Sequence, residues 1–403
     1  MSWDKVKIGD CCEITSSKRI FFSEYVECGV PFYRSKEIIE SSNGQAISEP
    51  LFISEEKYDE IRRNFGVPQS GDMLLTSVGT IGVPYIVKED DYFYFKDGNL
   101  TWFRKFNNKL TSQYLYYWVR SAEGQGVLNN TTIGSSQKAL TIASLKGLEI
   151  PCPPVDVQGR IVEILYSYDA LIENNQKQIK LLEETAQRLY KEWFVDLRFP
   201  GHETIPITDG IPEGWKRDEL NSIIGLLSGF AFKSADFTNT GTYKIVTIKN
   251  VQDGMFDGHN VSRIAGVPSK MPAHCYLSNG DILLSLTGNV GRVCVVNGSD
   301  YLLNQRVAKI KSDYPAFAYC LFRSNDMFVE MGNIANGAAQ QNLSPIKTGQ
   351  IKILIPPVEL LVRFEEVVSV YMKQMLNLNE QIELLQEARD RLLPKLMNGE
   401  IEV

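Results

Sequence analysis

Residues 70–82 read SGDMLLTSVGTIG and residues 279–291 read NGDILLSLTGNVG, and six of the thirteen positions are identical. A fixed repeat period of about 20–50 residues is typical of solenoid proteins. Here the two copies lie 209 residues apart in a chain of 403 residues, which indicates a duplicated domain. We interpret the Gly-x-x-Gly phrase as a tight turn between strands. A nucleotide-binding loop is the alternative, but the Lys-Ser/Thr pair of a P-loop and the third glycine of a dinucleotide site are missing.

Two long stretches carry the strongest pattern in the sequence, with seam positions at alternating steps of four and three residues. This 3.5-residue repeat is typical of a coiled-coil seam. The same steps place the polar residues Asn175 and Arg389 in the seam. Two helices that pack separately on globular cores are the alternative, but two matching helices in one chain favour pairing. The apolar seam residues are Ile161, Leu165, Ile172, Ile179, Leu182, Leu189, Phe364, Val368, Met375, Leu378, Ile382, Leu385 and Leu392.

The order of segments predicts an α+β (mixed α/β) protein with two similar domains, a pseudo-two-fold internal repeat and two long antiparallel coiled-coil helices. The second helix repeats the first at an offset of 203 residues, and PPV precedes both. The offset grows to 212 residues near the start, so we expect a shared framework with different loops. The predicted segments are a first domain at 1–155, a helix at 156–196, a Pro/Gly-rich linker with the second domain at 197–358, and a helix at 359–403. Within the domains we predict strands at 73–78, 84–89, 92–95, 100–105, 243–251, 281–286 and 292–297, and short helices at 55–64, 111–121 and 315–331.

Composition favours a protein of the cytoplasm. There is no run of 18 apolar residues, so we expect no membrane contact, and the N-terminal stretch has no apolar core of a signal peptide. The seven cysteines include no C-x-x-C pair, which argues against a disulfide framework or a zinc ribbon. The net charge of −7 lies wholly in the two helical stretches, with eight acidic and five basic residues in 156–196 and nine and five in 359–403. The domains are therefore close to neutral, which permits DNA binding. We expect outward acidic residues, such as Glu183, Glu184 and Glu387, to face protein partners.

The sequence contains no recognisable set of catalytic residues. His202, His259 and His274 lack metal-ligand spacing, and we expect neither a metal site nor a bound cofactor. Polar and basic residues in loops and at strand ends instead suit DNA, because Arg and Lys read guanine, Asn and Gln read adenine, and Ser and Thr contact bases or phosphates. The candidate DNA-binding residues are Lys18, Arg19, Arg34, Lys36, Thr76, Ser77, Thr80, Gln137, Lys138, Lys233, Thr247, Lys249, Asn250, Ser285, Thr287, Asn289, Asn304, Gln305, Arg306, Gln340, Gln341 and Asn342.

The full length resembles the specificity (S) subunits of type I restriction–modification enzymes. The resemblance rests on the junctions LKGLEIPCPPVDVQGRI (145–161) and IKILIPPVELLVRF (351–364), the linker FVDLRFPG…IPEGW, and the order of domains and helices. It implies a non-catalytic subunit whose two domains, as target-recognition domains, read a bipartite, asymmetric site on double-stranded DNA. Two modification subunits with S-adenosylmethionine would methylate adenine, and restriction subunits would use ATP and Mg²⁺. Two departures concern packing: Arg389 occupies a seam position, and Leu360–Leu361 replaces Val157–Gln158.

Two other functions stay open from the residues alone. The chain could be a coiled-coil adaptor that binds proteins, or a DNA methyltransferase or nuclease without recognisable motifs. A helix of about 36 residues would be about 54 Å long at about 1.5 Å per residue. A rod of that length matches roughly one and a half turns of DNA, at about 34 Å per turn, which favours two short half-sites separated by an unread gap.

Overall fold

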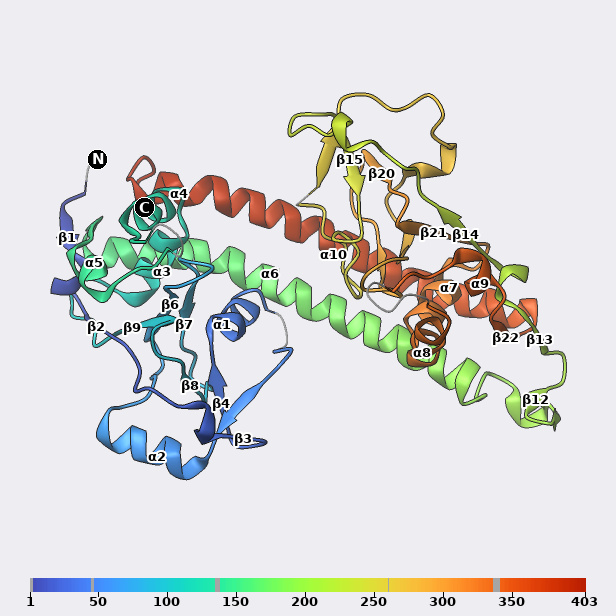
Figure 1. Ribbon diagram of the computed structural model, residues 1–403, viewed down its shortest axis with the longest axis horizontal. Coiled ribbons are helices and arrows are strands. Elements are labelled where there is room, and N and C mark those ends of the chain that lie inside the picture. Colours follow the sequence, from blue (N-terminus) through green and yellow to red (C-terminus); the bar gives the residue numbers. More distant parts are fainter. Residues whose placement is uncertain (1–2, 45–46, 135–137, 260, 336–340) are drawn as a thin grey trace. The chain divides into compact units, whose positions relative to one another are not determined.

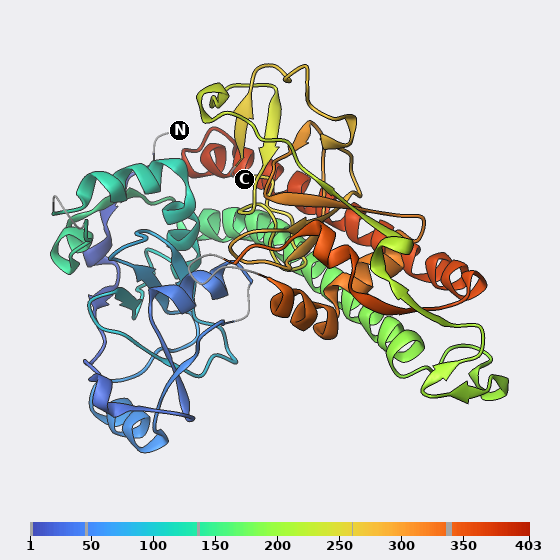
Figure 2. The ribbon, with the colours of Figure 1, turned by 45° about the vertical axis from the view of Figure 1, so that its right-hand side comes forward.

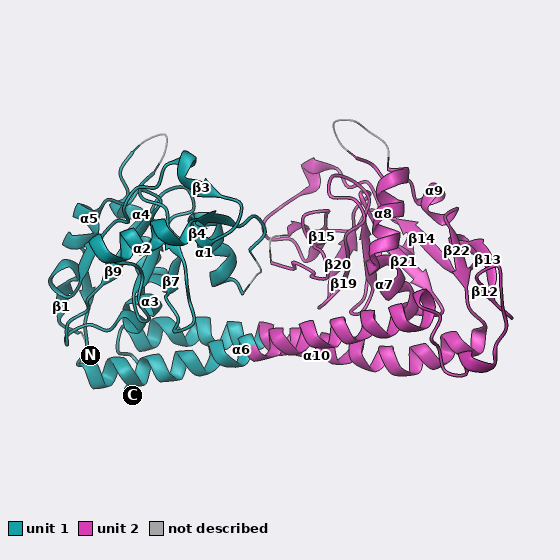
Figure 3. Cartoon of the chain, turned by 90° about the horizontal axis from the view of Figure 1, so that it is seen from below, with its two compact units in different colours: residues 1–173, 384–403 teal, residues 174–383 magenta. Residues whose placement is uncertain are grey.

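A computed structural model describes residues 3–44, 47–134, 138–259, 261–335 and 341–403. The chain forms two compact units: unit 1 comprises residues 1–173 and 384–403, and unit 2 comprises residues 174–383 (Figure 3). Two long helices, α6 (Val155–Tyr190) and α10 (Val358–Met397), each contribute to both units.

The shorter elements are labelled in Figure 1 where there is room. Those of unit 1 are β1 (Lys5–Lys7), β2 (Glu13–Thr15), β3 (Tyr25–Val26), β4 (Val30–Tyr33), α1 (Ser35–Ser42), β5 (Leu51–Ile53), α2 (Glu55–Asn64), β6 (Met73–Thr76), β7 (Pro84–Ile86), β8 (Tyr94–Phe95), β9 (Leu100–Arg104), α3 (Ser112–Arg120), α4 (Ala122–Thr131), α5 (Ile142–Gly147) and β10 (Glu149–Pro151). Those of unit 2 are β11 (Ile207–Thr208), β12 (Ile211–Pro212), β13 (Lys216–Glu219), β14 (Ile224–Ser228), β15 (Tyr243–Val246), β16 (Ser262–Ile264), β17 (Tyr276–Leu277), β18 (Ile282–Ser285), β19 (Val293–Val295), β20 (Tyr301–Leu303), β21 (Val307–Ser312), α7 (Pro315–Arg323), α8 (Asn325–Ile334), α9 (Pro345–Gly349) and β22 (Lys352–Ile355).

Both units share the same sheet topology. A two-stranded sheet joins β1 to β10 in unit 1 and β13 to β22 in unit 2. An antiparallel sheet has the order β2-β9-β6-β7 in unit 1 and β14-β21-β18-β19 in unit 2. The second four-stranded sheet is mixed, because β4 pairs with β8 in parallel and β15 pairs with β20 in parallel. That sheet gains β3 at its edge in unit 1 and β17 in unit 2. The predicted α+β class and internal repeat are therefore confirmed, and each predicted strand contains an observed one.

The repeated phrase builds the same turn in both units. The four glycines of the two Gly-x-x-Gly phrases adopt φ angles between 75° and 82°, a region that favours glycine. The Oγ1 of Thr76 accepts a hydrogen bond from the backbone N–H of Val83 at 2.9 Å. The Oγ of Ser285 accepts one from the N–H of Arg292 at 3.0 Å. The phrase is thus the tight turn, closed by a hydroxyl at the same position of each copy.

An Arg-Ser pair also recurs at one position of both units. Ser121 begins α4 and Ser324 begins α8, and each side chain accepts a backbone N–H of the first helical turn. Serine is favoured there because it satisfies an N–H that has no partner within the helix. The prediction of one helix at 315–331 is therefore wrong, since Ser324 separates α7 from α8.

Within each unit, the two long helices pack against each other in antiparallel orientation. In unit 1, Ile161 and Leu165 share a buried cluster with Leu393 and Leu396. In unit 2, Phe364 lies in one cluster with the C-terminal end of α6. All thirteen apolar seam residues are buried or half-buried. The same clusters include residues of α3 and β6 in unit 1 and of α7 and β18 in unit 2, so the buried stripe packs on the domain core as well as on the partner helix.

The segment after α6 has more structure than a linker requires. A π-helical turn (Lys191–Val195) extends α6, and the hairpin β11–β12 follows it (Figure 2). Phe199 and Trp215 are buried, with ring centroids 5.3 Å apart. Because both belong to the core cluster of unit 2, this segment packs on that unit.

Candidate nucleic-acid interface

In unit 2, the candidate residues gather where the parallel strands β15 and β20 end. The backbone N–H of Asn304, which follows β20, donates to the carbonyl of Val246, the last residue of β15, at 3.1 Å. The carbonyl of Arg306 accepts from Leu286 at 3.0 Å, and the carbonyl of Leu286 accepts from Leu343 at 2.7 Å. These bonds connect the loops after β15, β18 and β20 and the segment after α8 into one edge, which we name the loop edge.

The loop edge of unit 2 holds most of the candidates predicted for the second domain. Residues Thr247 and Lys249 follow β15, and residues 304–306 follow β20. Thr287 donates its hydroxyl to the Oδ1 of Asn342 at 2.8 Å, which joins the segment after α8 to the turn after β18. The exposed candidates at this edge are Lys249, Asn289, Gln305, Arg306, Gln341 and Asn342. The sequence therefore identified residues that the fold brings together from four separate segments.

A recess of about 180 Å³ opens at this edge, lined by Phe232, Ser234, Phe237, Thr247, Ile248, Asn304, Gln305 and Arg306. Four of these residues are predicted candidates. The other four were missed, because Phe232, Ser234 and Phe237 in the loop after β14 and Ile248 after β15 carry neither a charge nor an amide. The spacing of two phenylalanines around Lys233, in GFAFKSADF (229–237), was the available clue.

Unit 1 presents an equivalent edge with different side chains. Arg34 follows β4, and Lys96 and Asp97 follow β8. The guanidinium Nε of Arg19 lies 2.8 Å from the Oδ2 of Asp97, which places the loop after β2 at this edge. A bridge between residues 78 and 139 brings the loops of Thr80 and Lys138 together, and both of these residues are exposed.

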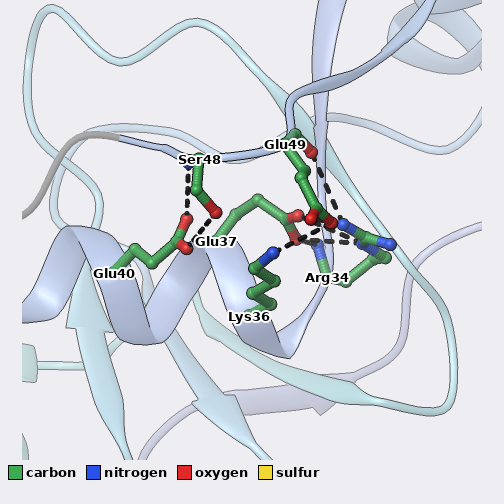
Figure 4. A network of polar contacts seen from close by, with 6 residues as sticks. All are labelled: Arg34, Lys36, Glu37, Glu40, Ser48 and Glu49. Carbon is green, nitrogen blue, oxygen red and sulfur yellow. Dashed lines mark hydrogen bonds and ion pairs between the residues drawn. The ribbon is translucent and has the colours of Figure 1, made fainter. Parts of the chain in front are cut away.

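Ion pairs dominate the loop edge of unit 1 (Figure 4). The Nη2 of Arg34 lies 2.5 Å from the Oε1 of Glu37, and the Nζ of Lys36 lies 2.9 Å from Glu49. The hydrogen bond from Arg34 to Glu37 raises the pKa of the arginine. The hydrogen bond from Lys36 lowers the pKa of Glu49. Ser48 donates to Glu40 at 2.6 Å and lowers its pKa. Arg34 and Lys36 are thus partly neutralised by carboxylates of their own unit.

The fourth residue after the parallel strand has the same role in both units. In unit 1, Glu37 accepts the backbone N–H of Arg34 at 2.6 Å. In unit 2, Asn250 accepts the backbone N–H of Thr247 at 2.8 Å and its hydroxyl at 3.0 Å. Both acceptors are fully buried. Asn250 therefore holds the loop in shape, and the prediction that its side chain contacts DNA is not supported.

Four further predictions need correction for the same reason. Thr76, Ser77, Ser285 and Thr287 are buried, and their hydroxyls bond within the protein. Thr76 and Ser285 close the repeated turn, and Ser77 bonds to Thr101 at 2.6 Å. Hydroxyls committed in this way are not available to DNA. Gln137 and Gln340 lie outside the described residues. Lys18 and Lys233 are exposed on the equivalent loops after β2 and β14.

Not all outward acidic residues of the long helices are free. Glu183 lies 2.5 Å from the Nη2 of Arg323 and accepts the hydroxyl of Tyr319 at 2.9 Å. The expectation that Glu183 faces a protein partner is therefore wrong, because the residue anchors α7 to α6. Glu184 and Glu387 are exposed, and among the described residues each pairs only with a residue one helical turn away on its own helix.

The described residues offer neither a metal site nor a membrane-spanning helix. Over 3–44, 47–134, 138–259, 261–335 and 341–403, no group of three or more His, Cys, Asp or Glu side chains could hold a metal ion. No helix in the same ranges is long and apolar enough to cross a membrane.

Comparison with known proteins gives one consistent family. The type I restriction enzyme MjaIX specificity subunit of Methanocaldococcus jannaschii is 27% identical over 431 residues, covering 100% of this chain and 94% of that protein. The MjaVIII specificity subunit of the same organism is 23% identical over 422 residues, covering 100% and 93%. The crystal structure of an S subunit of a type I restriction–modification system from M. genitalium has a similar fold, with a TM-score of 0.57, 16% identity, and coverage of 98% of this chain and 96% of that one. The family model for the type I restriction modification DNA specificity domain matches residues 1–184 and again residues 212–385. The chain therefore belongs to the type I restriction modification DNA specificity domain family, with one copy of the domain in each half.

Proposed function

We propose that this chain is the DNA-recognition subunit of a type I restriction–modification complex and reads a bipartite, asymmetric target. The observation that carries the proposal is the repeated loop edge, on a chain whose two halves both match the DNA specificity domain. Arg34 occupies the position that Thr247 occupies in unit 2, whereas Lys36 and Lys249 are both lysines at one shared position. Side chains of different type at one scaffold position would read different bases, so the two half-sites would differ.

The partners and cofactors follow from the same proposal. The chain would act without catalysis of its own and would dock two modification subunits, which bind S-adenosylmethionine and methylate adenine. Restriction subunits would join that complex and use ATP and Mg²⁺. Negatively charged helices repel DNA phosphates, so their exposed faces would be left for protein partners. Exposed acidic residues of α6 and α10, such as Glu184 and Glu387, are therefore the candidate docking contacts. Because its ligand would be intracellular DNA, we place its action in the cytoplasm.

Mapping of methylated adenines tests the proposal. Cells that express the modification subunits with this chain should carry methylation at one bipartite motif, and cells without the chain should lack it. The purified complex should bind duplexes that contain both half-sites in preference to duplexes with either one scrambled. Assembly without sequence-specific DNA binding would favour a protein-binding adaptor. Methylation by the isolated chain would favour an enzyme.

A further inference from the structure

The recess at the loop edge of unit 2 combines an apolar wall with free polar groups. Phe232, Phe237 and Ile248 line it and are only half-buried. The side chains of Asn304 and Gln305 line the same recess and make no hydrogen bond to any described residue. Half-exposed aromatic rings beside unused amides leave both apolar contact and hydrogen bonds available to a ligand.

The charges around the recess favour a polyanion. Lys233, Lys249 and Arg306 are exposed and form no ion pair within the described ranges. Unit 1 differs, because its Arg34 and Lys36 pair with carboxylates. Cations that are free of internal partners are available to phosphates, and release of counterions from DNA would strengthen their contribution.

The chemistry of the recess matches one base pair in particular. In the major groove, an A·T pair presents a donor and an acceptor on adenine and the C5-methyl group on thymine. Asn and Gln side chains bond both adenine groups, and phenylalanine contacts the thymine methyl. Resting on the proposed function, we propose that this recess reads an A·T pair of the second half-site, with the thymine methyl seated against Phe232 and Phe237.

Two other occupants fit less well. A phosphate gains nothing from two aromatic rings and Ile248. An extruded base must be enclosed to repay a few kcal/mol of unstacking, whereas Ser234, Gln305 and Arg306 at the recess are exposed. A volume of about 180 Å³ is also below the range of about 300–1,000 Å³ that is typical of pockets for drug-sized ligands. The recess therefore suits a fragment such as one base edge.

Substitution of uracil for thymine tests the proposal, because it removes only the C5-methyl group. The complex of this chain with its modification subunits is titrated with duplexes that carry uracil at one thymine of the second half-site at a time. At one position, binding should weaken about fourfold, the effect of one methylene-sized apolar contact. Phe232→Ala should abolish this difference, and Phe232→Leu should keep part of it. Phe22→Ala is the matched control, because Phe22 is 88% exposed in unit 1 and should leave the difference unchanged.

Each outcome bears on the recess or on the proposed function separately. If wild-type protein binds its bipartite site but tolerates uracil at every second-site thymine, the recess reads no methyl group and the inference is wrong. A thymine preference that survives in Phe232→Ala would also overturn it. At an A·T pair other than the methylated one, an increase in 2-aminopurine fluorescence at the adenine would indicate an extruded base instead. Failure of wild-type complex to distinguish the half-sites from scrambled DNA would refute the proposed function itself.

Discussion

The Nη1 atom of Arg389 in α10 lies 2.6 Å from the Oδ1 of Asp169 in α6. This ion pair explains why an arginine occupies a seam position of unit 1. The other carboxylate oxygen of Asp169 lies 3.0 Å from Arg120 and accepts the hydroxyl of Tyr117 at 2.8 Å. Only 13% of the Arg389 side chain is exposed. Asp169 thus compensates two arginines and connects both long helices to α3 of unit 1.

Removal of Asp169 should therefore cost more stability than removal of Arg389. Asp169→Leu leaves two partly buried arginines without their shared carboxylate, and we expect a loss of about 3 kcal/mol in the free energy of unfolding. Arg389→Leu leaves Asp169 paired with Arg120, and we expect a loss of about 1 kcal/mol. Equilibrium urea unfolding measures both. Glu184→Gln, on the exposed face of α6, is the control and should stay within about 0.5 kcal/mol. Equal losses for the first two variants would contradict the central role of Asp169.

Leu360–Leu361 of unit 2 replaces Val157–Gln158 of unit 1, and a residue further along α10 takes over the hydrogen-bonding role of Gln158. In unit 1, Gln158 accepts the N–H of Thr111 at 2.9 Å, before α3. In unit 2, Leu361 is buried, and Glu365 accepts the N–H groups of Ala316 and Phe317 at the start of α7. A carboxylate at a helix N-terminus is stabilising. Backbone N–H groups at the start of the helix therefore have an acceptor on the long helix in both units, Gln158 in unit 1 and Glu365 in unit 2.

The contribution of Glu365 to the free energy of unfolding should depend on pH, and the burial of its carboxyl group sets the direction. Burial raises the pKa of Glu365, although the two backbone hydrogen bonds oppose this shift. The folded state therefore binds the proton more tightly than the unfolded state, and the contribution of Glu365 to stability falls as pH rises through its pKa. Glu365→Gln does not titrate, so its stability relative to wild type should increase between about pH 4 and pH 7. Unfolding midpoints across this range check the sign, and a constant difference would contradict it.

Exposed acidic residues of the helices provide a test of partner docking. Reversal of Glu184 and Glu387 to lysine should change stability by only about 0.5 kcal/mol each, because the ion pairs that they form in the described part of the chain are exposed and lie within one helix. The variant should nevertheless assemble less with modification subunits, and methylation should fall at every site equally. Glu183→Lys should instead lower the melting temperature, because it places a second positive charge beside Arg323 and breaks the contact between α6 and α7. Native mass spectrometry and melting curves separate these results. Normal assembly of the double variant would place the docking surface elsewhere.

The sequence predicts those features that depend on local periodicity. The steps of four and three define both long helices, and short continuous apolar runs locate strands such as β6 and β18. The pairs Arg389–Asp169 and Glu365–Phe317 escape prediction, because their members lie 220 and 48 residues apart. At the loop edge, a hydroxyl side chain at a strand end was a misleading sign of DNA contact. Thr76 and Ser285 recur because both copies need the same turn, whereas positions such as Arg34 and Thr247 differ between the copies and remain candidates for base recognition.

Two single substitutions should each weaken recognition of one half-site and leave the other unchanged. Arg306 is exposed at the N-terminal end of β21 and makes no hydrogen bond from its side chain within the described residues. Its removal should leave the fold intact, and Arg306→Ala should weaken binding to the second half-site about 5–150-fold, the range for loss of a specific base contact. Arg19 pairs with Asp97 but is 68% exposed, and Arg19→Ala should weaken recognition of the first half-site only.

The control for this experiment lies on β21, the strand that Arg306 precedes. Lys311 is exposed near the other end of β21, so Lys311→Ala removes an equal charge from unit 2 away from the loop edge. Binding of each complex is measured on duplexes with one scrambled half-site, at several salt concentrations. A phosphate contact would lower affinity for all sequences and reduce the salt slope by about one, whereas a base contact would relax specificity at one position. If Arg306→Ala and Lys311→Ala have the same effect, Arg306 contributes only charge. If Arg306→Ala alters the first half-site as well, the two units do not read DNA independently, and the division of recognition between the two loop edges is wrong.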